Sequence, residues 1–349
     1  MIRNKLSLLS LIIIVGLSLT ISSCSSDHGE PSIIPEEPWT PPSVDPGKPG
    51  VHSPYISKVY DFLPAVGQFT NKMPQYNKGD TRADMIRKAE EQIKGSKPAG
   101  MISLGGYGGY VVFGFDHLVE NKKGLRDFRV LANAFWANAN PNPNGNSRGG
   151  SCEPGIIMVS YDENENGIPD DTWYEIKGSE HDRSIANYKI TYYRAESNKE
   201  PVLDPNKNYA TDVEYIRWED NQGGSGYKEK NQYHNQNYFP EWVDGASISF
   251  EGRLLPNNAI DESGKGNYWV LYSFKYGYAD NAPNNDSESA IDIDWAIDTE
   301  GNPANLKGIH FVKIYTALNQ EAGWLGETST EVSGAYDLHL KGEVIPTRK

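Results

Sequence analysis

The segment from Asp162 to Asp171 carries side chains that could bind a hard cation. Gly167 permits a sharp turn, and flexible coordination by oxygen atoms alone is what Ca²⁺ requires. The match to an EF-hand loop is partial, because Trp173 stands where the bidentate glutamate belongs and Pro169 prevents a helix from following. We therefore predict a structural Ca²⁺ in a hairpin loop, and the alternative is an acidic turn without metal. The expected ligands are Asp162, Asn164, Asn166, the Ile168 carbonyl, Asp170 and Asp171.

Aromatic residues form a second group, between residues 196 and 245. They stand among Asn, Gln, Gly, Glu and Lys, so few apolar neighbours are at hand to pack against the rings. Rings in such a setting can form a platform for a flat or sugar-like ligand. The alternative is that they fix a long loop onto the domain. The predicted ligand-binding residues are Trp218, Tyr227, Tyr238 and Trp242.

Catalytic signatures are weak. The seven histidines form no zinc motif and no nucleophile elbow is present, so we predict binding rather than catalysis. A carboxylate pair of a carbohydrate-active hydrolase, such as Glu153 with Glu175, remains an alternative, because sequence spacing does not reveal separation in space. We expect Cys152 to be a packed residue.

Two further patterns have structural interpretations beside functional ones. Residues 291–298 place Ile or Trp at alternate positions, with Asp292, Asp294 and Asp298 between or after them, which predicts a strand with its aspartates on one face, either solvated or holding a second metal. The run Gly105-Gly-Tyr-Gly-Gly109 lacks the ending of a phosphate-binding loop. It predicts a close approach between backbone segments.

The N-terminus resembles a bacterial lipoprotein signal. Arg3 and Lys5 precede an apolar run that ends in Ile-Ser-Ser-Cys24, so residues 1–23 are the expected signal peptide and Cys24 the expected lipidated residue. Residues 25–30 resemble the export signal of surface lipoproteins in the Bacteroidetes. This implies an outer-membrane lipoprotein at the cell surface. Residues 24–54 are rich in Pro and Ser, which predicts an extended tether.

The elements that must position these residues lie between 55 and 345. Asp80-Thr81 predicts the start of a helix over Arg82 to Lys94, which Gly95 ends. From Met101 onward, short β-branched or aromatic runs alternate with turn residues. They predict an all-β, jelly-roll-type β-sandwich with one short N-terminal helix and long loop insertions, of which 196–245 is the aromatic-rich one. The net charge of -14 argues against a nucleic-acid partner.

Four motifs of this chain resemble a family of Bacteroidetes cell-surface lipoproteins, known as cell surface proteins or PKD-domain proteins. They are Ile102-Ser-Leu-Gly-Gly-Tyr-Gly-Gly-Tyr-Val-Val-Phe-Gly-Phe-Asp-His117, Glu153-Pro-Gly-Ile-Ile-Met-Val-Ser-Tyr-Asp162, Asn166-Gly-Ile-Pro-Asp-Asp-Thr-Trp-Tyr-Glu175 and Gly323-Trp-Leu-Gly-Glu-Thr-Ser-Thr-Glu331. The order of these motifs is also similar to jelly-roll ligand-binding modules. No separate repeat is present, so we expect no true PKD domain.

The resemblance implies a role in nutrient capture. Such lipoproteins serve TonB-dependent transporters of the outer membrane, and relatives are associated with corrinoid uptake. The expected function is therefore a surface-anchored lipoprotein that binds a glycan, or a cofactor such as a corrinoid, for uptake. A carbohydrate-active hydrolase and a structural or adhesive surface protein are the alternatives.

Overall fold

The computed structural model of the protein describes residues 51–137 and 148–348. The predicted signal peptide, Cys24 and nearly all of the tether lie outside the described residues. Within the described ranges, none of the helices has the length and apolar character needed to cross a membrane.

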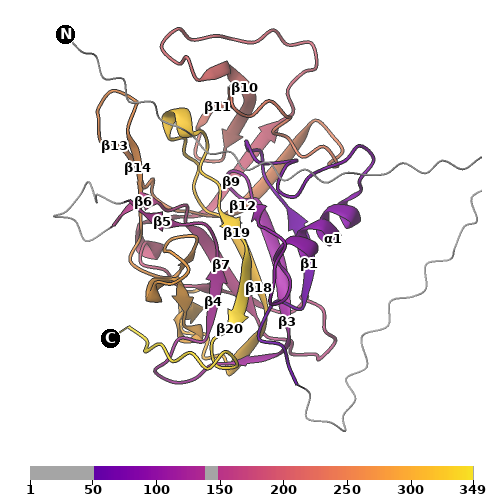
Figure 1. Ribbon diagram of the computed structural model, residues 1–349, viewed down its shortest axis with the longest axis vertical. Coiled ribbons are helices and arrows are strands. Elements are labelled where there is room, and N and C mark those ends of the chain that lie inside the picture. Colours follow the sequence, from indigo (N-terminus) through magenta and orange to yellow (C-terminus); the bar gives the residue numbers. More distant parts are fainter. Residues whose placement is uncertain (1–50, 138–147, 349) are drawn as a thin grey trace, which may run out of the picture. The chain divides into compact units, whose positions relative to one another are not determined.

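The helix α1 (Arg82–Ile93) begins and ends close to the predicted positions, and it is the α-helix of the described part of the chain. Thr81 caps it through a capping box with Asp84. Its buried side chains, Met85, Ala89 and Ile93, recur every four residues and so lie on one face. That face packs beside strand β1 (Lys58–Leu63; Figure 1).

The largest sheet has seven strands, all paired antiparallel. Its central strand β18 (Gly308–Thr316, GIHFVKIYT) is buried along most of its length, because both of its faces are covered. In spatial order the sheet runs β1 (Lys58–Leu63), β3 (Tyr110–Glu120), β18, β7 (Gly155–Ser160), β8 (Trp173–Ile176) and β17 (Ala296–Ile297), and β15 (Tyr278–Ala279) also pairs with β7.

A second layer faces this sheet across the main core. Ile102 and Val332 from this layer join Phe113 and Ile314 of the large sheet in one buried cluster, in which all four side chains are fully buried. Two antiparallel layers around one apolar core make a β-sandwich, so the predicted all-β fold class is confirmed. The second layer contains β16 (Ala290–Ile291), β4 (Phe128–Leu131) and β20 (Gly334–Asp337), and the pair β19 (Glu331–Val332) and β2 (Ile102–Ser103).

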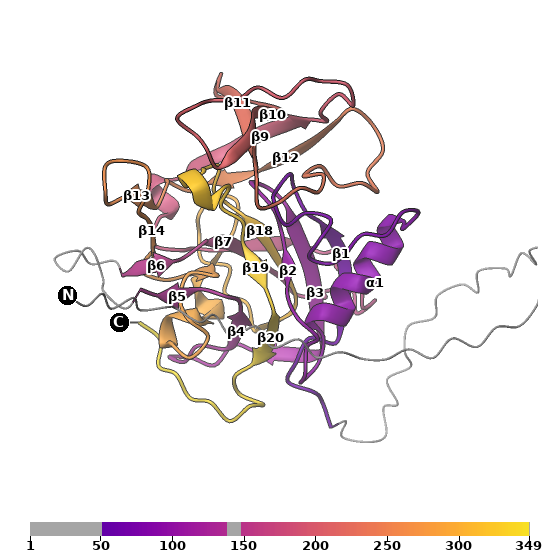
Figure 2. The same ribbon diagram turned by 45° about the horizontal axis from the view of Figure 1, so that its top comes forward.

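Two smaller sheets extend the sandwich, and Figure 2 shows them as separate groups of strands. The predicted insertion contributes a β-hairpin, β10 with β11, to the first sheet, so this region is more regular than a long loop. The first sheet contains β11 (Ser225–Asn231), β10 (Ala210–Asp220), β9 (Ile185–Tyr193) and β12 (Ser247–Leu254). The second contains β13 (Ala259–Asp261), β14 (Trp269–Tyr272), β6 (Gly149–Ser151) and β5 (Phe135–Trp136).

The prediction of one continuous strand over residues 291–298 is wrong. A turn of 3₁₀-helix, η3 (Ile293–Trp295), separates β16 from β17. Asp292 caps this turn by accepting a hydrogen bond from the Asp294 N–H at 2.8 Å, and it is buried instead of solvated. Short polar side chains favour such caps over strands. The other 3₁₀ turns are η1 (His181–Arg183), η2 (Ser287–Ser289) and η4 (Gly323–Leu325).

Candidate functional site

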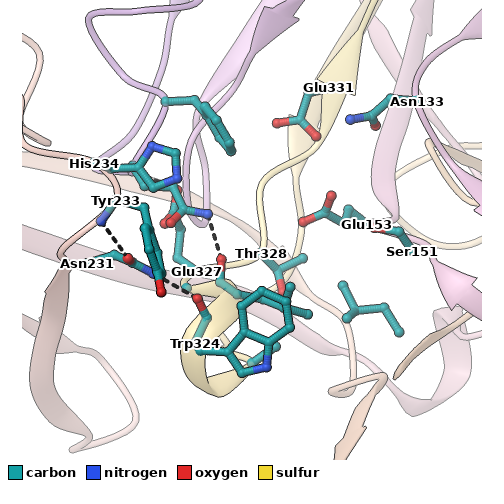
Figure 3. Close-up of a pocket in the computed structure, with 16 residues that line it drawn as sticks. Asn133, Ser151, Glu153, Asn231, Tyr233, His234, Trp324, Glu327, Thr328 and Glu331 are labelled. Atoms are coloured by element: carbon teal, nitrogen blue, oxygen red, sulfur yellow. Dashed lines mark hydrogen bonds between the residues drawn. The ribbon is translucent and has the colours of Figure 1, made fainter. Parts of the chain in front are cut away.

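A pocket of about 320 Å³ lies where the two smaller sheets meet the segment that leads into β19. Aromatic side chains stand on one side of it, and Glu153, Glu331 and Asn133 on the other (Figure 3). The lining residues are Gln68, Phe69, Asn133, Ser151, Glu153, Asn231, Tyr233, His234, Leu271, Ala322, Trp324, Leu325, Gly326, Glu327, Thr328 and Glu331.

Two exposed rings form the rim of the pocket. Tyr233 is 67% exposed and Trp324 is 44% exposed, which is high for side chains of this size. The buried Asn231 connects them, because its Nδ2 donates to the Trp324 carbonyl at 2.8 Å and its Oδ1 accepts from the Tyr233 N–H at 2.9 Å. Deeper in, the rings of Phe69 and His234 meet edge to face at 4.8 Å. The rim is therefore aromatic, and the Asn231 side chain holds the backbone of both rim residues in place.

Three carboxyl groups gather at the acidic side: those of Glu153, Asp280 and Glu331. Each offers an oxygen atom that lies within 4.8 Å of the other two. Asp280 accepts hydrogen bonds from the N–H groups of Ala134 and Glu331, both at 2.9 Å. Ser329 binds the other two groups, through its N–H to Glu153 at 3.1 Å and through its Oγ to Glu331 at 2.6 Å. These hydrogen bonds hold the three carboxyl groups in fixed positions.

Burial decides the protonation of this cluster. It raises the pKa of Glu331 to about 7, and it raises the pKa values of Glu153 and Asp280 well above their ordinary values. The neighbouring charge of Glu331 raises the latter two further. Like charges this close in a low dielectric disfavour joint ionisation. Burial and mutual repulsion therefore favour the protonated forms of these three carboxyl groups.

Glu327 is a fourth acid of the pocket and is 6% exposed. Burial raises its pKa to about 8, although the Gln68 N–H, which donates to its Oε1 at 2.7 Å, favours the ionised form. Behind it, Glu321 lies 3.9 Å from the buried ammonium of Lys228, and burial raises the pKa of Glu321 to about 7. The pocket thus contains acids on both sides, and a carboxyl group that keeps its proton can donate as well as accept a hydrogen bond.

Gln68 presents an unsatisfied acceptor. Its Nε2 donates to the Leu325 carbonyl at 2.7 Å, but its Oε1 has no hydrogen-bond partner, and the residue is only 5% exposed. A buried acceptor without a donor costs about 1–3 kcal/mol. Because Gln68 lines the pocket, a hydroxyl or amino group of a ligand could remove this cost.

The predicted aromatic platform is dispersed in the structure. Tyr238 is 1% exposed and belongs to the core under the β9–β12 sheet, against which Trp218 also packs. Trp242 packs on the main core instead, stacked on Phe62 with ring centroids 6.4 Å apart. Tyr227 is exposed on β11. None of the four lines the pocket, because apolar neighbours from distant segments cover three of these rings.

The predicted calcium loop is the turn of the hairpin formed by β7 and β8. The Asp162 carboxylate accepts from the N–H groups of Asn166 at 3.1 Å and Gly167 at 2.9 Å, and Gly167 has a φ of 71°. The Asn166 Oδ1 accepts from the Ile168 N–H at 2.7 Å, and its Nδ2 donates to Asp170 at 3.1 Å. Asn164 donates to Asp170 at 3.4 Å, and Asp171 accepts from the Glu163 N–H at 3.1 Å. The six predicted ligands therefore share one tight loop, and Ca²⁺ binding there stays a prediction.

The hydrolase pair Glu153 with Glu175 does not form in this pocket. Glu175 is bound by His181 at 2.8 Å and by Arg253 at 3.1 Å, and it does not line the cavity. Glu153 lies with Glu331 instead. Cys152 is fully buried, and burial raises its thiol pKa, as expected of a packed residue.

Sequence reasoning missed most of the pocket. A local indication of the pocket was present in the sequence, in the segment Gly323–Glu331 (GWLGETSTE). This segment contains a tryptophan and two glutamates and has neither strand nor helix periodicity. Gln68 and Asn133 gave no such signal, because only the folded chain brings them to the cavity. Comparison of the chain with models of known protein families gives no match, and comparison with curated proteins gives none either.

Proposed function

We propose that this protein binds a neutral, hydroxyl-rich ligand of mono- to disaccharide size in the pocket between Trp324 and Glu331. The observation that carries the proposal is the combination, in one pocket, of an exposed aromatic rim, buried acids with raised pKa values and an unpaired amide oxygen. The apolar face of a sugar ring can stack on Trp324 or Tyr233. Its hydroxyl groups are donors and acceptors together, as are protonated carboxyl groups.

The size of the cavity supports a small ligand. About 320 Å³ is near the lower end of the range of roughly 300–1,000 Å³ found for ligand pockets. A corrinoid, with its macrocycle and nucleotide loop, is much larger than this volume. Only one part of such a molecule would fit into the pocket. Within the nutrient-capture role that the family resemblance implies, we therefore favour a glycan as the ligand. On this proposal, lipidated Cys24 anchors the protein in the outer membrane at the cell surface, and a TonB-dependent transporter receives the ligand.

Calorimetric titration of the full-length protein tests the proposal. The probes are neutral mono- and disaccharides: glucose, galactose, mannose, xylose and their β-linked dimers. We expect saturable binding of at least one probe, and a loss of about fivefold or more in affinity in the Trp324→Ala variant, because stacking on a ring contributes about 1 kcal/mol. The matched control is Tyr268→Ala, which removes a 48% exposed ring outside the pocket. Failure of every probe to bind, or equal affinity in both variants, would count against the proposal.

The pH dependence distinguishes a neutral ligand from a cationic one. As the pH rises from 6 to 9, Glu331 and Glu327 lose their protons, since their pKa values lie near 7 and 8. Binding of a neutral ligand should weaken over this range, because acid groups that donate hydrogen bonds are lost. Binding of an amine or a metal ion would strengthen over the same range instead. That outcome would indicate that the ligand is a cation and not a neutral sugar.

Hydrolysis is the second candidate, and one observation favours it. Glu153 and Glu331 offer oxygens within 4.8 Å of each other, close to the separation of about 5–5.5 Å in retaining glycosidases. The test is release of reducing sugar from the disaccharide that binds, compared among the wild type, Glu153→Gln and Glu331→Gln. Turnover that both variants abolish would establish catalysis. Binding without turnover would leave the protein a binding protein.

A further inference from the structure

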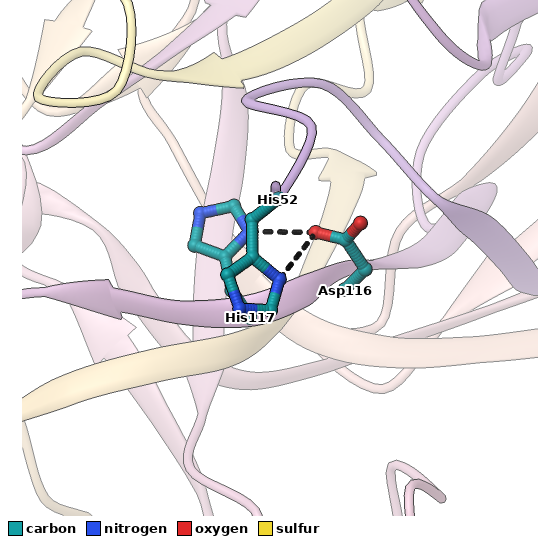
Figure 4. Close-up of side chains that lie close together, drawn as sticks. All are labelled: His52, Asp116 and His117. Carbon is teal, nitrogen blue, oxygen red and sulfur yellow. Dashed lines mark hydrogen bonds and ion pairs between the residues drawn. The ribbon is translucent and has the colours of Figure 1, made fainter. Parts of the chain in front are cut away.

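A cluster unrelated to the pocket lies near residue 52, where the described chain begins. It consists of His52, Asp116 and His117, and Figure 4 shows the Asp116 carboxylate facing both imidazole rings. The Asp116 Oδ1 lies 2.8 Å from the His117 Nδ1 and 3.6 Å from the His52 Nδ1. One nitrogen from each ring and one carboxylate oxygen therefore converge within 4.8 Å.

A bulge in strand β3 gives Asp116 and His117 their common direction. Neighbouring residues of a regular strand point to opposite faces. Here the register of β3 with β18 is irregular: Phe311 pairs with Gly114, but Ile309, two residues earlier, pairs with Val119. The extra β3 residues between these pairs include both members of the cluster. Bulges re-aim side chains and are frequent next to functional sites.

His117 has more hydrogen-bond acceptors around it than a neutral ring can serve. Its Nε2 lies 2.9 Å from the Asp337 Oδ2, while its Nδ1 faces Asp116 at 2.8 Å. A neutral imidazole carries a single N–H. A protonated ring donates to both carboxylates. A neutral ring whose N–H points to Asp337 leaves its Nδ1 lone pair facing Asp116, and a metal ion bound by both atoms can take the place of the second proton.

The surroundings hold the ligand atoms in place. Asp337 has a side chain that is 3% exposed, and its other oxygen accepts from the N–H groups of His339 at 2.6 Å and Leu340 at 3.0 Å. A buried carboxylate behind a histidine is the usual support of a metal-binding imidazole. Asp116 is held likewise, because its Oδ2 accepts from the Ser53 N–H at 3.3 Å and its Oδ1 stays directed at the rings.

We propose that His52, Asp116 and His117 bind a divalent transition-metal ion, with Zn²⁺ as the best match. Two imidazoles and one carboxylate are a common set of three protein ligands for Zn²⁺, with the fourth position left to water or an external donor. Nitrogen donors disfavour Ca²⁺ and Mg²⁺, which prefer oxygen. The side chains of His52 and Asp116 are 43% and 42% exposed, so an ion can enter from solvent. The bound ion ties the chain around His52 to β3.

Titration of the full-length, untagged protein with Zn²⁺ against a colorimetric chelator tests the proposal. We expect one class of tight sites in the wild type and a loss of tenfold or more in affinity in both His52→Ala and Asp116→Ala. Asp337→Asn should weaken binding by about 10–100-fold, because it removes the support behind His117. Co²⁺ as a second probe should give the visible absorption of a four-coordinate site, which the His52→Ala variant lacks.

Two controls separate this site from other sites in the chain. His234→Ala removes a histidine of the pocket, and Asp162→Ala alters the predicted calcium loop; both should bind Zn²⁺ like the wild type. Thermal unfolding of each variant shows whether it is folded, and His52→Ala, at an exposed position, leaves the fold unperturbed. Zn²⁺ affinity unchanged in both His52→Ala and Asp116→Ala, or no saturable binding by the wild type, would overturn the proposal.

Discussion

Replacement of Glu327 by Gln should make the protein less sensitive to alkaline pH. Burial raises the pKa of Glu327 from its ordinary value of 4.5 to about 8. The folded state therefore binds this proton more tightly than the unfolded state does. The contribution to stability is complete below about pH 4.5 and is lost as the pH rises through about 8. Glutamine resembles the protonated acid in shape and does not titrate.

The magnitude follows from the difference between the two pKa values. One pH unit corresponds to about 1.4 kcal/mol, so the roughly three units between pH 5 and pH 8 correspond to about 4 kcal/mol. The side chain is only 6% exposed, so solvent screens little of this effect. At about 2 °C per kcal/mol for a domain of this size, the melting temperature of the wild type should fall by about 8 °C more than that of Glu327→Gln.

Urea unfolding followed by tryptophan fluorescence measures the effect at pH 5, 6, 7, 8 and 9. We expect the wild type and Glu327→Gln to have similar free energies of unfolding at pH 5, and the variant to be the more stable at pH 9. The control is Glu91→Gln, which changes a side chain that is 57% exposed on α1. Parallel curves for the wild type and Glu327→Gln over the whole range would refute the reasoning, since Glu327 would then be ionised inside the folded protein.

Three further predictions concern metal binding, helix capping and backbone packing. Asp162→Ala should lower the melting temperature in both buffers, because its carboxylate accepts from the N–H groups of Asn166 and Gly167, but more in Ca²⁺ than in EDTA, because a metal that binds only the folded state stabilises it by mass action; an equal loss in both buffers would argue against a metal at this loop. Thr81→Ala should cost about 1 kcal/mol in urea unfolding, because it removes the capping box of α1; an unchanged free energy of unfolding would show that packing alone holds this end of the helix. Gly109→Ala should prevent folding, because its Cβ would lie 1.8 Å from the Leu104 carbonyl oxygen and 2.3 Å from the Ala65 nitrogen; a folded variant by circular dichroism would contradict this close approach.

Local sequence was sufficient wherever the deciding interactions are local. The start of α1 was predictable because the Thr81 cap lies three residues from its partner. The hairpin around residues 162–171 was predictable for the same reason, since its turn residues and flanking strands are contiguous. The all-β class followed from many short β-branched runs, a pattern that does not depend on which strands pair.

The candidate pocket was decided by tertiary structure. Glu153 and Glu331 are 178 residues apart in the chain, and Gln68 reaches Glu327 across 259 residues. No spacing rule relates such positions, because the pairing of distant strands brings them together. The fold also buries Tyr238 and packs the partly buried Trp242 on the main core, whereas the polar local sequence predicted two exposed rings.

Residue chemistry and chain topology thus contributed different parts of the result. The sequence by itself determined the strand-rich class, the capped helix and the oxygen-rich loop, because each depends on neighbours within a few residues. Only the tertiary structure decided which carboxyl groups share a low-dielectric space and hold protons, since desolvation depends on what the whole fold places around a group. It likewise brought His52 to Asp116 and His117, across more than sixty residues of sequence.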